Sequence, residues 1–212
     1  MKIQSFEGGY DKNFSYIIYD ESSTECAIVD AAVPVESIAS QITDNHLNPT
    51  ILLITHSHHD HICYLNEYLE TFEQLTVYAF DPHLTENQKT FQHGDNITAG
   101  SINFSVIHTP GHTPESYCFL AHDSLFTGDT LFVGRTGRTI STGSNSLHLY
   151  RSVYEKILAL PKNTIIYPGH NYGNVPYITI EENIKISPLL KAESEDDFVR
   201  RMDEFEASRV SV

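Results

Sequence analysis

The segment from Thr55 to His61 has the sequence Thr-His-Ser-His-His-Asp-His. It follows the apolar run Ile51–Ile54, which is typical of a buried strand. It precedes apolar residues that recur at the spacing of one helix face: Ile62, Leu65, Tyr68 and Leu69. Histidines that gather around an acid at the end of a strand are explained better by metal binding than by packing.

The spacing within this segment predicts positions for two metal ions. In an extended chain, side chains two residues apart point the same way, so His56 and His58 could face one ion together. The turn into the helix would then place Asp60 and His61 as an adjacent pair, which could hold a second ion. Imidazole with carboxylate suits zinc, iron or manganese better than calcium or magnesium. The alternative is a polar loop that is rich in histidine by chance, or a weak metal-binding tract on the surface.

Length and composition are those of an ordinary globular protein with one sizeable core. The chain has 212 residues, of which 40% are hydrophobic and 19% charged, and we expect a single domain over residues 1–212. The net charge of −15 argues against a protein that mainly grips nucleic acid or an anionic membrane. Local basic groups could still bind a small anion.

The cysteines and the apolar runs indicate the cellular compartment of the protein and the redox state of its thiols. Cys26, Cys63 and Cys118 are odd in number and lack the Cys-x-x-Cys spacing, so a disulfide framework is not expected. The residues from Met1 to Tyr10 lack the apolar centre of a signal peptide, and no later run has the length of a membrane span. These features predict a cytoplasmic protein.

Strands and small-residue turns alternate along most of the chain. We expect strands at Phe14–Tyr19, Cys26–Val29, Ile51–Thr55, Thr76–Phe80, Ile102–Ile107, Tyr117–Leu120, Ser124–Phe126 and Thr164–Tyr167. We expect helices after Pro34, from His61, from Leu147 to Pro161, and in pieces after Glu181. The stretch Asp81–Gly100 is predicted to be irregular. A histidine or aspartate follows a strand and turn at four places, His56, His112, Asp129 and His170, as expected for a site built at strand ends.

Four ordered motifs together resemble the metallo-β-lactamase superfamily over nearly the whole chain. They are the histidine-rich segment Thr55–His61, Pro110-Gly111-His112-Thr113-Pro114, Thr127-Gly128-Asp129-Thr130-Leu131-Phe132, and Pro168-Gly169-His170. The resemblance implies an α/β fold, a four-layer αββα sandwich with the metals at one edge. It also implies a metal-dependent enzyme.

The resemblance implies two sets of metal ligands joined by a bridging carboxylate. The first set is His56, His58 and His112. The second set is Asp60, His61 and His170, and the bridge is Asp129; the two aspartates are also the expected catalytic residues. Two divalent ions that share a water lower its pKa from about 16 to about 7, which gives hydroxide at neutral pH. Such a bridging hydroxide can attack an acyl carbon without a serine or cysteine nucleophile.

Within the superfamily, the segment Phe126–Arg138 resembles glyoxalase II, the hydroxyacylglutathione hydrolases. That resemblance implies hydrolysis of an acyl-thiol ester, with Arg138 and Tyr172 contacting a glutathione conjugate. Ile140 stands where those enzymes carry a second glutathione-binding tyrosine, and the 42 residues after His170 are too few for their longer C-terminal region. The implied metals are two Zn²⁺, with Fe²⁺ or Mn²⁺ as alternatives.

A second branch of the same superfamily, the persulfide dioxygenases, is the alternative. Leu149–Lys156, Ile166–Pro168 and the tail around residues 181–189 resemble it. There, His56, His112 and Asp129 would form the two-histidine, one-carboxylate face of a non-haem Fe(II) oxygenase. Against this branch, its Cys-Gly-Arg-Thr-Asp-Phe run appears here as Thr136–Ser141, without the cysteine or the aspartate. The sequence favours the hydrolase and leaves the thiol and the oligomeric state open.

Overall fold

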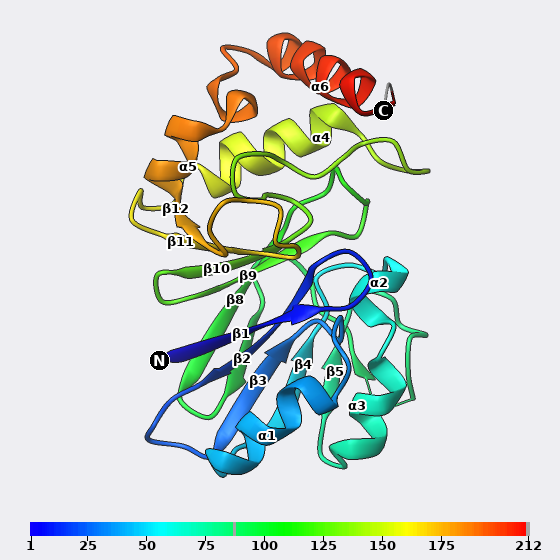
Figure 1. The fold of residues 1–212 in the computed structure, drawn as a ribbon, viewed down its shortest axis with the longest axis vertical. Coiled ribbons are helices and arrows are strands. Elements are labelled where there is room, and N and C mark those ends of the chain that lie inside the picture. The colour runs from blue at the N-terminus through cyan, green and yellow to red at the C-terminus, as the bar shows by residue number, and fades with distance from the viewer. Residues whose placement is uncertain (87, 211–212) are drawn as a thin grey trace.

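Two six-stranded sheets form the centre of the protein, seen in a computed structural model that describes residues 1–86 and 88–210 (Figure 1). The first sheet has the order β1 (Lys2–Gly8), β2 (Asn13–Tyr19), β3 (Glu25–Val29), β4 (Asn48–Leu53), β5 (Thr76–Tyr78) and β6 (Gln88–Lys89). The second has the order β12 (Ile178–Thr179), β11 (Ile165–Pro168), β10 (Ser124–Gly128), β9 (Tyr117–Ala121), β8 (Ile102–His108) and β7 (Asn96–Ala99). Both sheets are mixed, with parallel pairs at β3–β4–β5–β6 and at β10–β11.

Helices cover the outer face of each sheet (Figure 1). The helices beside the first sheet are α1 (Glu36–Asp44), α2 (His59–Ile62) and α3 (Leu65–Thr71). Those beside the second are α4 (Ser146–Arg151), the π-helical η1 (Ser152–Ile157), α5 (Ile180–Ile186), the 3₁₀ turn η2 (Pro188–Lys191) and α6 (Glu195–Val210). The predicted four-layer αββα sandwich is therefore confirmed.

Strand β2 illustrates why the sequence forms buried layers. Every residue of β2 is buried, because successive side chains point to opposite faces and both faces are covered. Phe14, Tyr16 and Ile18 enter the core between the two sheets. Ile17 and Tyr19 enter a second core beneath the helices of the first sheet.

Two predictions about secondary structure were wrong. The helix expected from His61 is divided into α2 and α3, because the backbone of Ala31, just after β3, forms hydrogen bonds with His61 and Tyr64 in place of helical ones. Ala31 N donates to His61 O (3.0 Å), and Tyr64 N donates to Ala31 O (3.1 Å). The stretch expected to be irregular, Asp81–Gly100, contributes the edge strands β6 and β7, where the alternation of exposed and buried residues in β7 is short and easily overlooked.

The structure bears on two further expectations, for the cysteines and for a membrane span. Cys26, Cys63 and Cys118 are free thiols. Within residues 1–86 and 88–210, no helix combines the length and apolar character that crossing a membrane requires.

Candidate metal centre

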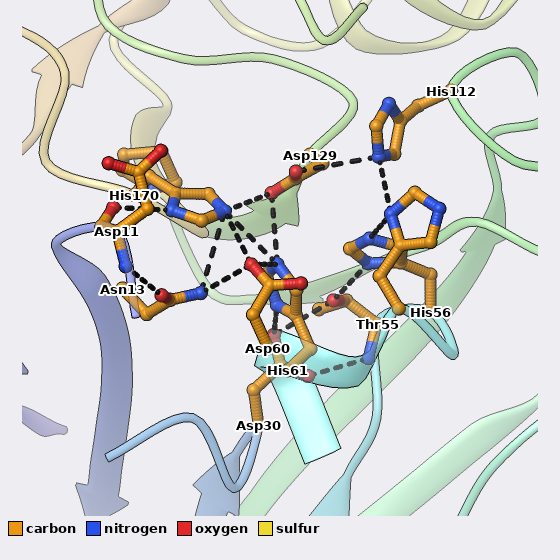
Figure 2. A network of polar contacts seen from close by, with 12 residues as sticks. Asp11, Asn13, Asp30, Thr55, His56, Asp60, His61, His112, Asp129 and His170 are labelled. Carbon is orange, nitrogen blue, oxygen red and sulfur yellow. Dashed lines mark hydrogen bonds and ion pairs between the residues drawn. The ribbon is translucent and has the colours of Figure 1, made fainter. Parts of the chain in front are cut away.

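Loops that follow strand ends in both sheets bring the predicted ligands together (Figure 2). His56 and His58 follow β4, and Asp60 and His61 lie in α2. His112, Asp129 and His170 follow β8, β10 and β11 of the second sheet. All seven residues therefore meet at one edge of the sandwich.

The first cluster contains His56, His58, His112 and Asp129, whose ligand atoms all lie within 4.8 Å of one another. Nδ1 of His58 is 3.1 Å from Nε2 of His56 and 2.9 Å from Nε2 of His112. Oδ2 of Asp129 is 3.4 Å from Nε2 of His112. The prediction that His56 and His58 face the same space agrees with this geometry.

The second cluster contains Asp60, His61 and His170, again with ligand atoms within 4.8 Å of one another. Nε2 of His170 is 3.3 Å from both Nε2 of His61 and Oδ2 of Asp60. Oδ1 of Asp129 faces this cluster at 3.2 Å from Nε2 of His61, while its Oδ2 faces the first (Figure 2). The two clusters and the carboxylate between them form a binuclear His/Asp metal site.

Hydrogen bonds outside the clusters fix which nitrogen of each ring faces inward. His61 Nδ1 donates to Asp30 Oδ2, His112 Nδ1 to the carbonyl of Arg138, and His170 Nδ1 to the carbonyl of Asp11, each at 2.8 Å. Carbonyl and carboxylate oxygens only accept, so the proton of each neutral ring lies on Nδ1. The lone pair of Nε2 is then directed at the centre of the site, as in metal-bound histidines.

The protonation of the ligands fits a cation in this place. Burial, together with the neighbouring His61, keeps the pKa of His56 well below its usual value. Burial disfavours the charge of Asp129, but the nearby charge of His61 holds the pKa of Asp129 well below its usual range. Oδ1 of Asp129 is buried without a hydrogen-bond partner among the described residues. Imidazoles around an ionised, unsatisfied carboxylate are the donor set that divalent metals bind.

Asp30 supports the centre and was not singled out from the sequence. It is buried at the end of β3, with φ of 57°. It accepts from Thr55 N through Oδ1 and from Thr55 Oγ1 through Oδ2, both at 2.8 Å, in addition to His61. The sequence feature that could have indicated this role is a lone acid directly after the apolar run Cys26–Val29. The structure adds that this strand, β3, pairs in parallel with β4 and so ends beside the histidine-rich loop.

Asn13 is a second supporting residue that sequence reasoning missed. Its buried side chain donates through Nδ2 to Asp60 Oδ2 at 2.9 Å and lies 3.5 Å from Nε2 of His170. Its Oδ1 accepts from the backbone N–H of Asp11 at 3.0 Å. Nothing local in the sequence indicates this role, since His170 is distant in the chain.

Glycines allow the ligand loops to approach one another closely. A Cβ on Gly169 would lie 2.5 Å from Oδ1 of Asp129 and 2.7 Å from Cε1 of His61. Gly128, with φ of 47°, would meet Thr55 Oγ1 at 2.6 Å. The small residues before Asp129 and His170 are therefore needed for the clusters to close.

A cavity of about 110 Å³ adjoins the first cluster. Its walls are Asp11, His112, Asp129, Phe132, Arg135, Thr136, Arg138 and Tyr172. The two residues expected to contact substrate, Arg138 and Tyr172, thus lie beside the metal ligands. Each also has a partner within the chain: Arg138 Nε donates to Glu206 Oε2 at 2.8 Å, and Tyr172 Oη donates to Asp11 Oδ2 at 2.6 Å.

The sequence model of the metallo-beta-lactamase superfamily matches residues 8–79 and 66–170. The chain belongs to this superfamily. A curated relative is the probable polyketide biosynthesis zinc-dependent hydrolase BaeB of Bacillus velezensis. It is 29% identical over 193 residues, which cover 88% of this chain and 85% of BaeB.

Solved structures of this superfamily share the fold. ETHE1 from Myxococcus xanthus is 29% identical, with a TM-score of 0.88 over 97% of this chain and 91% of its own. The B3 metallo-beta-lactamase BLEG-1 is also 29% identical, with a TM-score of 0.79 over 90% of this chain and 100% of its own. The protein is thus a metallo-beta-lactamase superfamily member with a binuclear His/Asp site.

Proposed function

We propose that this protein is a metal-dependent hydrolase that cleaves the thioester of a small acyl-thiol. The observation that carries the proposal is the position of Asp129, whose two oxygens face the two ligand clusters. A carboxylate between two metal positions is typical of sites that activate water for hydrolysis. The similarity to BaeB, a probable zinc-dependent hydrolase, supports the reaction class and favours zinc over iron or manganese.

The residues around the cavity favour direct attack by water. When bound, the two ions would supply an acidified water and a Lewis acid for the acyl oxygen. The described residues that line the cavity include no serine or cysteine. The hydroxyl of Thr136, the one threonine among them, is buried and donates to Gly137 O at 3.2 Å, so no side chain there offers an exposed nucleophile for a covalent acyl intermediate. Water would add to the acyl carbon and the C–S bond would break, which releases a carboxylic acid and a thiol.

The identity of the thiol is proposed only as a class. A glutathione conjugate would use Arg138 and Tyr172, but both make hydrogen bonds to acids of this chain, Glu206 and Asp11. Ile140, at the place of the second glutathione-binding tyrosine, is 59% exposed and has no hydroxyl. These contacts favour a small acyl-thiol whose thiol part is recognised in another way.

A persulfide dioxygenase is the second candidate. It is favoured by His56, His112 and Asp129, which lie together in the first cluster as two histidines and one carboxylate. Leu149–Lys156, which resembles that branch, belongs to α4 and η1, and its Tyr154 Oη donates to Leu189 O in the outer helical layer. That resemblance therefore concerns packing rather than the reacting groups.

One experiment separates the two candidates. The protein is loaded separately with zinc and with ferrous iron, and is given S-lactoylglutathione, a simple S-acetyl thioester, or glutathione persulfide. Thioester loss that needs metal but no oxygen is the expected result. Oxygen uptake with the persulfide only in the iron form, without thioester loss, would establish the second candidate instead.

A further inference from the structure

The cavity beside the first cluster is small for a substrate pocket. Its volume is about 110 Å³, whereas pockets that enclose most of a drug-sized ligand measure about 300–1,000 Å³. Since a group of the size of a water molecule occupies about 30 Å³, about four such groups fill the cavity. Only one short arm of a thioester therefore fits beside His112 and Asp129, the two cluster residues that line it.

The acyl arm of the substrate matches this space better than the thiol arm does. A thioester has two arms, which leave the reacting carbon on the acyl side and on the sulfur side. The thiol arm of a glutathione or pantetheine thioester is a chain much longer than this cavity. Such an arm would extend away from the cavity, in keeping with the hydrogen bonds that already engage Arg138 and Tyr172 with acids of this chain.

Phe132 forms a firmly held part of the cavity wall. Its backbone N–H donates to Arg135 O at 2.8 Å, and its carbonyl accepts from Nδ2 of the buried Asn183 at 2.9 Å. The ring of Phe132 is 3% exposed and meets the rings of Tyr172 and His170 at interplanar angles of 74° and 70°, with centroids 5.1 and 5.8 Å away. Because the backbone and the ring are both held, moving this wall to admit a longer chain is costly.

Phe132 is also the hydrocarbon part of the wall. Among the described residues that line the cavity, it is the one whose side chain contains only carbon and hydrogen. A hydrocarbon acyl chain in the cavity therefore makes its apolar contact with Phe132. A chain longer than the space in front of this ring would meet the ring itself, so the volume of Phe132 limits the length of the chain.

We propose that Phe132 sets the length of the acyl group, and that the substrates are thioesters of short acyl chains with up to about four carbons. The inference rests on the proposed thioesterase function and adds the substrate class, a short-chain acyl-thiol whose thiol arm lies outside the cavity. A pocket of this kind can select by length, because one methylene that fits or fails to fit changes the rate by about 10- to 200-fold.

The test is a series of thioesters that differ only in acyl length. The S-acetyl, S-butanoyl, S-hexanoyl and S-octanoyl esters of N-acetylcysteamine share one thiol arm, and kcat/KM is measured on each with the metal-loaded protein. For the wild type, kcat/KM is expected to fall by about 100-fold or more from the butanoyl to the octanoyl ester. Equal values of kcat/KM on the acetyl and octanoyl esters would overturn the inference.

Phe132→Ala opens the wall and is expected to raise the octanoyl-to-acetyl ratio of kcat/KM by about tenfold or more. Phe132→Leu removes less volume and should raise the ratio less. Phe198→Leu is the matched control, since Phe198 is a buried phenylalanine of α6 that packs on Tyr150, outside the cavity. Its ratio should equal that of the wild type. If Phe132→Ala does not fold, Phe132→Leu decides: a folded variant with the wild-type ratio contradicts the proposal.

Binding of the product acids keeps the inference separate from the proposed reaction. Calorimetry with the zinc-loaded protein compares acetate, butanoate, hexanoate and octanoate. If the protein cleaves no thioester but binds the short acids more tightly than octanoate, and Phe132→Ala removes the difference, the reaction is wrong and selection by length stands. If thioesters are cleaved at rates independent of acyl length, the reaction stands and the inference is wrong. Neither turnover nor binding of any acid would refute both.

Discussion

His61 Nδ1 lies 2.8 Å from Asp30 Oδ2, and both side chains are buried. Asp30 also accepts hydrogen bonds from the backbone N–H and the hydroxyl of Thr55, the residue before the first histidine of the motif. One carboxylate at the end of β3 therefore orients both the loop after β4 and a ligand of α2. Hydrogen bonds that orient a metal-binding histidine from outside the site usually have a large effect on metal affinity.

Replacing Asp30 by Asn is expected to weaken metal binding by about 10- to 100-fold. Asparagine tolerates the left-handed backbone of this position and can still accept from Thr55, but His61 loses its charged acceptor. Competition with a chelator measures the affinity. Asp44→Asn, on the exposed end of α1, is the control and should bind as the wild type does. Equal affinity in Asp30→Asn would contradict the supporting role.

Replacing Asp129 by Asn is expected to lower kcat/KM for a thioester by about a thousandfold or more. The variant keeps the side-chain shape but loses the charge between the two clusters, so the bound metal should fall below two ions per chain. The unfolding free energy of the metal-free protein should change by no more than about 2 kcal/mol. Metal analysis, kinetics and denaturant unfolding give these values. Full turnover at unchanged metal content would refute the bridging role.

The metal-free protein is expected to lose stability as the pH rises from 6.5 to about 9. Burial alone would lower the pKa of His170, but hydrogen bonds to Asp129 and Asp60 raise it to about 9, from its usual value of 6.5. Because the folded pKa is raised, the stabilisation is complete below 6.5 and is lost through 9. Thermal unfolding at several pH values should show a falling midpoint without metal.

The metal-loaded protein is the control for this pH dependence, because the ion takes the place of the proton. Its midpoint should stay nearly constant over the same interval, and metal binding at neutral pH should release protons into a weakly buffered solution. A midpoint of the metal-free protein that rises with pH would show that the sign is wrong.

Replacing Gly169 by Ala is expected to reduce binuclear metal binding with little effect on secondary structure. The added methyl would lie 2.5 Å from Oδ1 of Asp129 and displace the bridging carboxylate. The number of ions bound per chain and the circular dichroism spectrum check the two parts of this expectation. Two tightly bound ions in the variant would show that the site can relax around the methyl group.

Most of the core strands and the members of the two ligand clusters were predictable from the sequence. Apolar strands carry a strong pattern, and His56, His58, Asp60 and His61 are close together in the chain. His112, Asp129 and His170 needed the resemblance to a known family, since a single histidine or aspartate after a strand has many possible roles. The geometry then agreed with the expected clusters.

The residues that sequence reasoning missed depend on contacts between distant segments. Asn13 meets Asp60 and His170 only when the turn between β1 and β2 folds over the strand ends. The turn after Asp129 is likewise held by Asn183, which is remote in the chain. Strand β1 was missed because it lies at the edge of its sheet and contains only exposed and half-buried residues, which leaves a weak apolar signal.

Because the ligands come from both sheets, bound metal ions would cross-link the two halves of the sandwich. The apolar core between the sheets contains no ligand and can assemble without them. In the unfolded chain, His56 and His170 are separated by a long loop, so the complete set of donors exists only after the halves have met. Metal binding would therefore follow folding, and newly synthesised protein would be folded but inactive until it binds its metal ions.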